Sequence, residues 1–263
     1  MSRELDIDSD RHKKWHDILD HLSGWTYQEM SLPRSKDEDK NVEKPKVKVF
    51  RYTEKGTPWW RNNTLGIQQI YPAGAIGLDS SKEDLEVSRN TIDVRNGWLD
   101  GNGMNSFYPA AVRVGYNPEV ILTKLREMIE KLAAPNGFIR GNPHGCENCS
   151  IVPNTINEML CMSHRGVLRL FSVWPKNKDA RFANLRAWGA FLVSSEFKGG
   201  EVRYVDVTSE QGRKLTVQNP WPGRPVTVTR GDGKVETVSG TRFDLETKVG
   251  EKLRFVPQNG GRQ

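Results

Sequence analysis

Apolar residues in this chain follow a helical spacing ahead of residue 165 and an alternating spacing towards the carboxyl end. The clearest helix begins at Pro118, because proline suits a first helical position and apolar residues then recur every three or four positions. Its expected buried face is Val120, Ile121, Leu125, Met128, Ile129 and Leu132. Further helices are predicted over residues 10–24, 81–94, 105–114 and 153–164. This part of the chain is therefore expected to be rich in α-helix.

The caps of two of these helices can be assigned from local residues. Ser9 or Asp10 can cap the first helix, which Gly24 is expected to close. Ser80 or Ser81, followed by acidic residues, forms a capping box for the next one.

After Asn184 the apolar period changes to two. Short strands are predicted over residues 202–207, 214–217, 226–229, 235–238 and 253–256, and Gly-Gly, Pro-Gly and Gly-Asp-Gly turns separate them. This pattern is typical of an antiparallel β-domain, which we expect to be a sandwich. The sequence thus predicts an α+β protein, with a helical domain over residues 1–184 and a β-domain over residues 185–263.

Charge and hydropathy exclude several classes of function. The 263 residues carry a formal charge of +6, but lysine and arginine alternate with acidic residues instead of forming a basic stripe, so we expect no nucleic-acid partner. We expect no membrane partner either, since no run of about 18 apolar residues occurs. The first residues lack the apolar core of a signal peptide, and three cysteines leave the cellular compartment undecided. The oligomeric state is equally undecided.

A polar, glycine-punctuated loop leads into the helix predicted from Pro153. Within it, Glu147 has Asn142, His144 and Asn148 as neighbours, which offer hydrogen bonds but no opposing full charge at neutral pH. A carboxylate in such surroundings can act as a base towards water, and a loop ahead of a rigid helix is a common place for catalytic groups. Glu147 is therefore the candidate catalytic residue, and the alternative is a solvated loop glutamate.

The residues around this loop resemble glycoside hydrolase family 95, the inverting α-L-fucosidases and their α-L-galactosidase relatives. Glu147-Asn148-Cys149 occupies the position of the family's Asp-Gly-Asn, and Glu158-Met159-Leu160 and Ser163-His164 match its Glu-Met-Leu and Gln-Ser-His. The segment over residues 185–193 is similar to the family's Leu-Arg-Ala-Arg-Gly-Gly-Phe-Glu-Val. The resemblance covers much of the chain from Trp15 onwards and is most specific over residues 148–193.

This resemblance implies a fold and a reaction. The helices would be the carboxy-terminal portion of an (α/α)6 toroid, and the chain would be the last part of a longer enzyme that hydrolyses terminal α-L-fucosides or α-L-galactosides with inversion. The expected partner is an oligosaccharide or glycan, no cofactor is required, and family members are often secreted or periplasmic. Glu147 would be the general base, although the family has aspartate there. No residue here matches the family's general acid; Glu29 and Glu54 are poor substitutes, so the chain alone is expected to be weak or inactive.

Several residues are candidates for binding the sugar. His144, Asn142 and Asn148 can hydrogen-bond sugar hydroxyls or orient Glu147, and the alternative is that they satisfy a local turn. Trp98 and Trp59 are candidate stacking platforms, and for Trp98 a structural role is the alternative. Asn62 lies where the family has a histidine-rich stretch, and those histidines are absent.

Two alternative hypotheses for the function stay open. Cys146-x2-Cys149 followed by Cys161-x2-His164 supplies a Cys3His pattern that suits tetrahedral zinc, with Cys161 and His164 expected on one helix face. Cys161 is equally well explained as a small core residue. The chain can thus also be a zinc-stabilised interaction module, or a non-catalytic carbohydrate-binding fragment in which Glu147 has no role.

Overall fold

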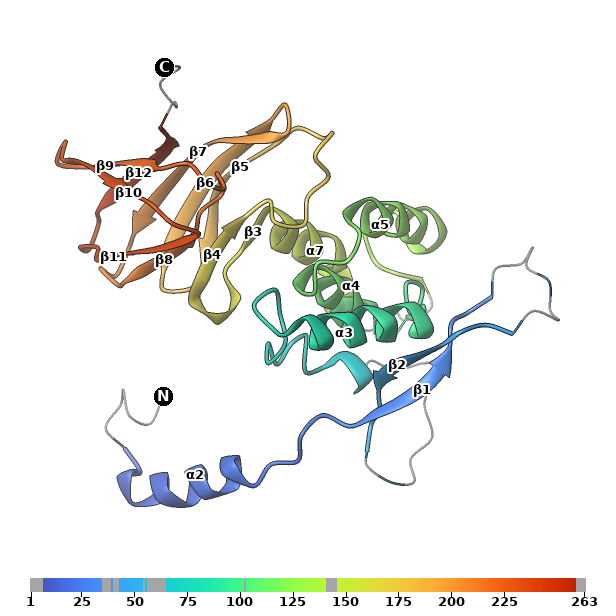
Figure 1. The fold of residues 1–263 in the computed structure, drawn as a ribbon. Coiled ribbons are helices and arrows are strands. Elements are labelled where there is room, and N and C mark those ends of the chain that lie inside the picture. Colours follow the sequence, from blue (N-terminus) through green and yellow to red (C-terminus); the bar gives the residue numbers. More distant parts are fainter. Residues whose placement is uncertain are drawn as a thin grey trace.

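The structure, a computed structural model, describes residues 7–34, 39, 43–53, 55, 65–101, 103–140 and 146–258, with only the backbone at Leu65 and Cys146. It confirms the α+β class, with helices mainly ahead of residue 161 and most strands after it (Figure 1). The helices are α2 (His12–Asp20), α3 (Lys82–Arg95), α4 (Met104–Arg113), α5 (Pro118–Leu132), α6 (Cys146–Cys149) and α7 (Ile151–Leu160), with 3-10 turns η1 (Ser9–Arg11), η2 (Leu65–Ile67) and η3 (His164–Gly166).

The strands form three sheets. They are β1 (Tyr27–Ser31), β2 (Lys46–Phe50), β3 (Cys161–Met162), β4 (Val167–Leu170), β5 (Ala180–Ala187), β6 (Phe191–Lys198), β7 (Glu201–Ser209), β8 (Leu215–Gln218), β9 (Val226–Arg230), β10 (Val235–Val238), β11 (Arg242–Leu245) and β12 (Lys252–Pro257). β1 pairs with β2, six strands form an antiparallel sheet in the order β10-β9-β12-β7-β6-β5, and four form a sheet in the order β11-β8-β4-β3. β4 and β8 run parallel, whereas the sequence predicted antiparallel pairing throughout.

The predicted strands over residues 202–256 are all present, because alternation and turn residues act locally. The helix predicted over residues 105–114 is also confirmed, with Pro109 inside α4. The predicted helix over 153–164 is wrong at its end: α7 stops at Leu160, and the following two residues pair with β4 as β3. The apolar period of the helix carries no information about this strand pairing, so it did not predict where the helix ends.

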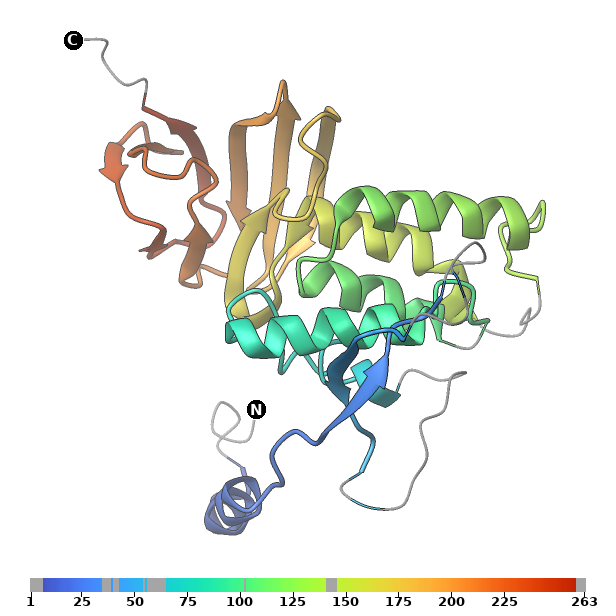
Figure 2. The same cartoon turned by 45° about the vertical axis from the view of Figure 1, so that its right-hand side comes forward.

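α2 differs from its prediction in length and burial. It ends at Asp20 instead of reaching Gly24, and neither Ser9 nor Asp10 supplies a side-chain cap. Its apolar stripe is exposed, with Ile18 at 49% and Leu19 at 60%. Figures 1 and 2 both show the helix standing away from the rest of the protein.

Two apolar clusters make up the core. The helical cluster is built around α3, α4, α5 and α7, with Phe107, Tyr108 and Ile121 fully buried. The β cluster receives side chains from both larger sheets, such as Leu168 and Phe255. Ile156 and Trp174 pack against both clusters, so the two clusters adjoin ahead of Asn184. The predicted domain boundary between residues 184 and 185 falls inside β5.

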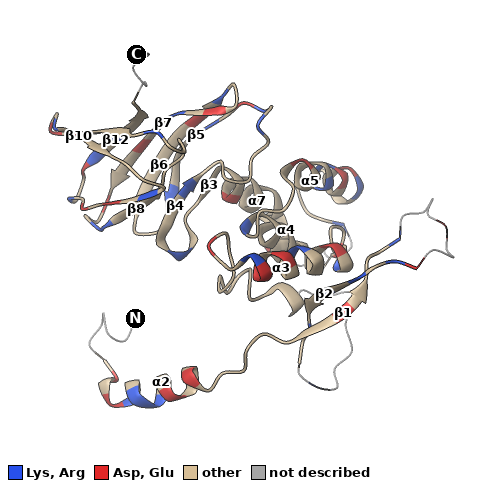
Figure 3. Cartoon of the chain, in the orientation of Figure 1, with Lys and Arg blue, Asp and Glu red and all other residues tan. Residues whose placement is uncertain are grey.

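Charged residues of both signs alternate along the elements, as Figure 3 shows for α2, α3 and the β-strands. One group joins the two halves: Asp79 receives hydrogen bonds from Arg169 of β4 and from Arg242 of β11. Among the helices of the described ranges, none is both long and apolar enough to cross a membrane.

Candidate functional site

Glu147 lies on the short helix α6, directly ahead of α7, with its side chain exposed to solvent. Its backbone carbonyl accepts hydrogen bonds from the Ser150 amide at 3.1 Å and the Ser150 hydroxyl at 2.6 Å. These two bonds hold the main chain in a turn, and neither of them involves the Glu147 carboxylate. The carboxylate is therefore open to water and to a ligand from outside.

The neighbouring residue anchors this turn to the rest of the protein. Asn148 is only 2% exposed, and its amide nitrogen donates to the backbone oxygen of Gly101 at 3.0 Å. Gly101 belongs to the loop that leads into α4, and the carbonyl of Asp100 in that loop accepts bonds from the first amides of the helix. The buried Asn148 thus anchors the turn that carries the exposed Glu147, and its burial leaves little surface for the predicted contact with a sugar.

Asp100 is an acidic residue of the loop ahead of α4 that the sequence did not single out. It stands next to the residue that Asn148 binds, so the structure brings a second carboxyl-bearing segment to the same end of the helices. The only signal in the sequence was its place after Trp98, in a glycine-containing loop ahead of a helix.

Trp98 does not offer a sugar platform in this structure. It is 4% exposed, and its ring packs edge-on against Phe107 at 4.9 Å and Tyr108 at 5.1 Å between centroids, with Tyr116 at 5.6 Å. Because neighbouring rings cover the indole, the packing supports the structural alternative. The Trp98 carbonyl also accepts a hydrogen bond from the buried Tyr108 hydroxyl at 3.0 Å.

Four of the predicted site residues, Asn142, His144, Trp59 and Asn62, lie outside the described residues. Of the predicted site, the structure therefore places Glu147, Asn148 and Trp98. It brings Asn148 and the Trp98 loop together through Gly101.

The proposed zinc ligands fall at opposite ends of α7. Cys149 precedes this ten-residue helix and Cys161 follows it, and ten helical residues span about 15 Å, far more than two ligands of one ion allow. The prediction that Cys161 and His164 share a helix face is wrong, because the helix has ended before either residue. Within the described ranges no three potential ligands gather around one point.

Burial shifts the pKa values of both Cys161 and His164. It raises the pKa of the Cys161 thiol to about 12, with the Glu158 carboxylate adding to the effect, so this cysteine stays protonated. Burial likewise lowers the pKa of His164 to about 4, helped by the charges of Arg113 and Arg169. The imidazole packs so closely on Gly77 that a β-carbon there would lie 2.2 Å from its Nε2 atom.

A partly buried polar network runs along the side of α7. Arg113 of α4 donates two hydrogen bonds to the Glu158 carboxylate, at 2.8 and 3.3 Å, and its guanidinium lies 4.5 Å from the centre of the Tyr71 ring. The Tyr71 hydroxyl accepts a bond from the Asn154 amide at 2.8 Å. Asn154 and Glu158 are four residues apart on a mainly apolar helix, and that spacing was the signal for a shared polar face.

A scan against models of protein families found no match, and a search of curated proteins found none either.

Proposed function

We propose that this chain is part of an inverting glycoside hydrolase of the α-L-fucosidase type, with Glu147 as the general base. The observation that carries the proposal is the pairing of an exposed Glu147 with a buried, hydrogen-bonded Asn148. A base must reach water while its backbone stays fixed, and these two neighbours meet both needs. The motif resemblance over residues 148–193 supplies the reaction class.

The finer fold assignment belongs to the same proposal. α3 with α4 and α5 with α7 would be two helical hairpins of a larger toroid. The apolar cluster that the six-stranded and four-stranded sheets share supports a sandwich-like β-domain.

Inversion needs two carboxyl groups about 6.5–9.5 Å apart on opposite sides of the sugar. Glu147 would take a proton from a water molecule as the water oxygen attacks the anomeric carbon, and an acid would give a proton to the leaving oxygen. No residue of this chain matches the family's acid, so the acid step is the part that we expect to be impaired.

An activated substrate tests the base without the acid. Fluoride leaves α-L-fucosyl fluoride without needing a proton from the protein, so the chain should hydrolyse it and release β-L-fucose, which proton NMR identifies. Glu147→Gln should lower this rate by about 100-fold or more, because general base catalysis typically contributes 10²–10⁴-fold. Glu130→Gln, at an exposed glutamate of α5, is the matched control and should leave the rate unchanged.

The hypothesis of a non-catalytic carbohydrate-binding fragment makes the opposite prediction. If the chain only binds carbohydrate, the fluoride is hydrolysed no faster than in buffer and Glu147→Gln changes nothing. Release of α-L-fucose would equally contradict the proposal, since it means retention of configuration.

A further inference from the structure

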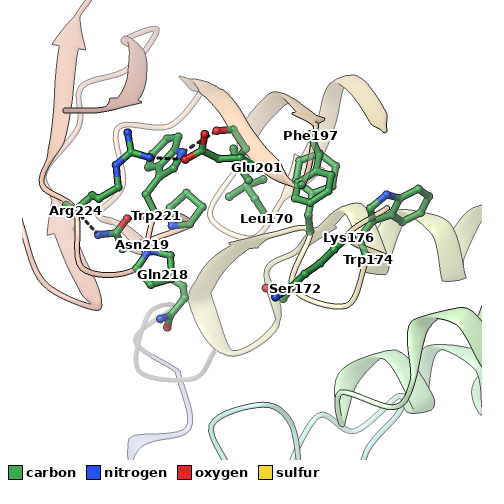
Figure 4. A pocket seen from close by; sticks show the side chains of 15 residues that line it. Leu170, Ser172, Trp174, Lys176, Phe197, Glu201, Gln218, Asn219, Trp221 and Arg224 are labelled. Carbon is green, nitrogen blue, oxygen red and sulfur yellow. Dashed lines mark hydrogen bonds and ion pairs between the residues drawn. The ribbon is translucent and has the colours of Figure 1, made fainter. Parts of the chain in front are cut away.

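A hollow of about 610 Å³ opens in the β-domain, within the size range of small-molecule sites. Figure 4 shows Trp221, Glu201 and Arg224 along one side and Phe197, Lys176 and Trp174 along the other. These residues come from the segment after β4, the β6–β7 hairpin and the connection between β8 and β9. Three segments far apart in the sequence thus form one concave surface.

The apolar part of the wall is aromatic. Phe171 and Phe197 pack together at 5.3 Å between ring centres and are almost fully buried. Trp174 is half-buried, and its indole nitrogen donates to the Lys178 carbonyl at 2.8 Å, which fixes the plane of the ring. An indole held in this way offers a stable face for the C–H groups of a flat, partly apolar ligand.

The polar part of the wall is held rigidly as well. Arg224 donates to the Glu201 carboxylate, and both side chains remain partly exposed, at 36% and 41%. Beneath them, Asn219 donates to the carbonyls of Arg224 at 3.0 Å and Gly240 at 2.9 Å, and the Trp221 indole donates to the Val202 carbonyl at 2.7 Å. The rim can therefore offer donors and acceptors to hydroxyl groups without first rearranging.

A second hollow of about 390 Å³ adjoins the first. Ser172, Trp174 and Lys176 line both, and the second continues to Gly115 and Pro118 at the start of α5. The combined surface therefore continues from the β-strands to the start of α5.

This surface lies at the opposite end of the helices from Glu147. α7 starts next to Glu147 and ends at β3, in the sheet, whereas α5 runs the other way and starts beside the hollows (Figure 2). A ligand bound here therefore does not occupy the proposed catalytic position.

We propose that the hollow is a binding site for a neutral glycan, separate from the site at Glu147. Aromatic faces beside fixed hydrogen-bonding groups match the two chemical characters of a sugar ring, its apolar C–H face and its hydroxyl edge. Glu201 and Arg224 neutralise each other, and Lys176 is the third charged residue in the lining, so the wall lacks the cluster of unpaired cations that favours phosphate or polyanions.

Binding is best followed by NMR titration of the whole chain with D-galactose, L-fucose and the trisaccharide 2′-fucosyllactose. The indole N–H signals of Trp174 and Trp221 should shift, and the trisaccharide should bind more tightly than either monosaccharide. Trp174→Ala should weaken binding about tenfold, a loss of the size expected for an aromatic contact. Trp188→Ala removes a tryptophan that is 72% exposed elsewhere and should have no effect.

Because Trp174 packs against both apolar clusters, its removal can weaken the fold. Ser172→Trp avoids this difficulty, since Ser172 is exposed and a bulky ring there fills the hollows without removing a packed side chain. This variant should melt like the parent protein and lose binding.

Glu147→Gln should bind these sugars as the parent does, whatever it does to hydrolysis, so the two proposals fail independently. The absence of shifts with all three sugars would overturn the proposal. So would unchanged binding in a folded Ser172→Trp variant, or a preference for inorganic phosphate or D-galacturonate over D-galactose.

Discussion

At the residue scale, the ion pair between Arg113 and Glu158 should contribute measurably to stability. The two side chains are 11% and 16% exposed, so removing either one leaves a charge in a poorly hydrated place. Glu158→Ala should lower the free energy of unfolding by about 3 kcal/mol, as breaking a buried pair does, and urea denaturation measures the loss.

The pair between Lys124 and Glu127 supplies the matched control, because its side chains are 33% and 36% exposed. Glu127→Ala should cost less than about 1 kcal/mol. Equal losses from the two substitutions would show that burial does not govern the pair between α4 and α7.

Trp98 and Trp174 show how far residue type alone can be interpreted. The resemblance singled out Trp98 as a candidate sugar platform, and nothing in the sequence singled out Trp174. In the structure neighbouring rings surround Trp98, whereas Trp174 is half-buried along two hollows. Which aromatic is open to a ligand depends on neighbours that are distant in sequence, so no local pattern separates the two.

At the element scale, the start of α3 is set by its own residues. The Ser81 hydroxyl oxygen accepts a hydrogen bond from the Asp84 amide at 3.0 Å, as predicted, and the same hydroxyl donates to the Asp84 carboxylate at 2.8 Å in place of the backbone amide of a full capping box. Ser81→Ala leaves that amide without its partner and should lower the unfolding free energy by about 1 kcal/mol.

Ser81→Asp restores a capping oxygen and should recover most of that loss, which thermal melts of the three proteins can compare. If the alanine and aspartate variants have the same melting temperature, a capping oxygen at position 81 does not stabilise the start of α3.

α5 and α7 differ in how much of them the sequence could predict. α5 starts at Pro118 as predicted, with Asn117 as its cap, and it ends at Leu132, the last apolar residue of the predicted face. Ile129, however, is 41% exposed despite its place in the predicted buried face, and it lines an open hollow that Val152 and Ile156 of α7 also line. α7 stops early because β3 finds a partner in β4, a pairing that depends on tertiary structure.

At the scale of the whole molecule, Asp79 joins the helical half to the β-sheet half. Burial alone would raise the pKa of its carboxyl, but hydrogen bonds and charge from Arg169 and then Arg242 outweigh it and hold the pKa below the ordinary 3.8. The folded protein therefore binds this proton less readily than the unfolded chain does. The stabilisation is fully present above pH 3.8 and is lost as the pH falls through the lowered value.

Asp79→Asn should lower the melting temperature at neutral pH, and the difference from the parent should shrink as the pH falls below the ordinary carboxyl value. Melting curves at a series of pH values test this. Asp10→Asn, at an exposed carboxyl near α2, should show no such trend. A constant difference between Asp79→Asn and the parent at every pH would contradict the assigned role of the carboxylate.

The sequence by itself determined the α+β class, the cap of α3, the start of α5 at Pro118 and most strands after Asn184, because periodicity, capping and turn preference act between neighbours in the chain. It also singled out Glu147 and its polar neighbour Asn148. Only the tertiary structure decided that α7 gives way to β3, that β4 lies parallel to β8, and that Trp98 is core. The hollow beside Trp174 likewise arises where three distant segments converge, and contacts between distant residues leave no period in the sequence.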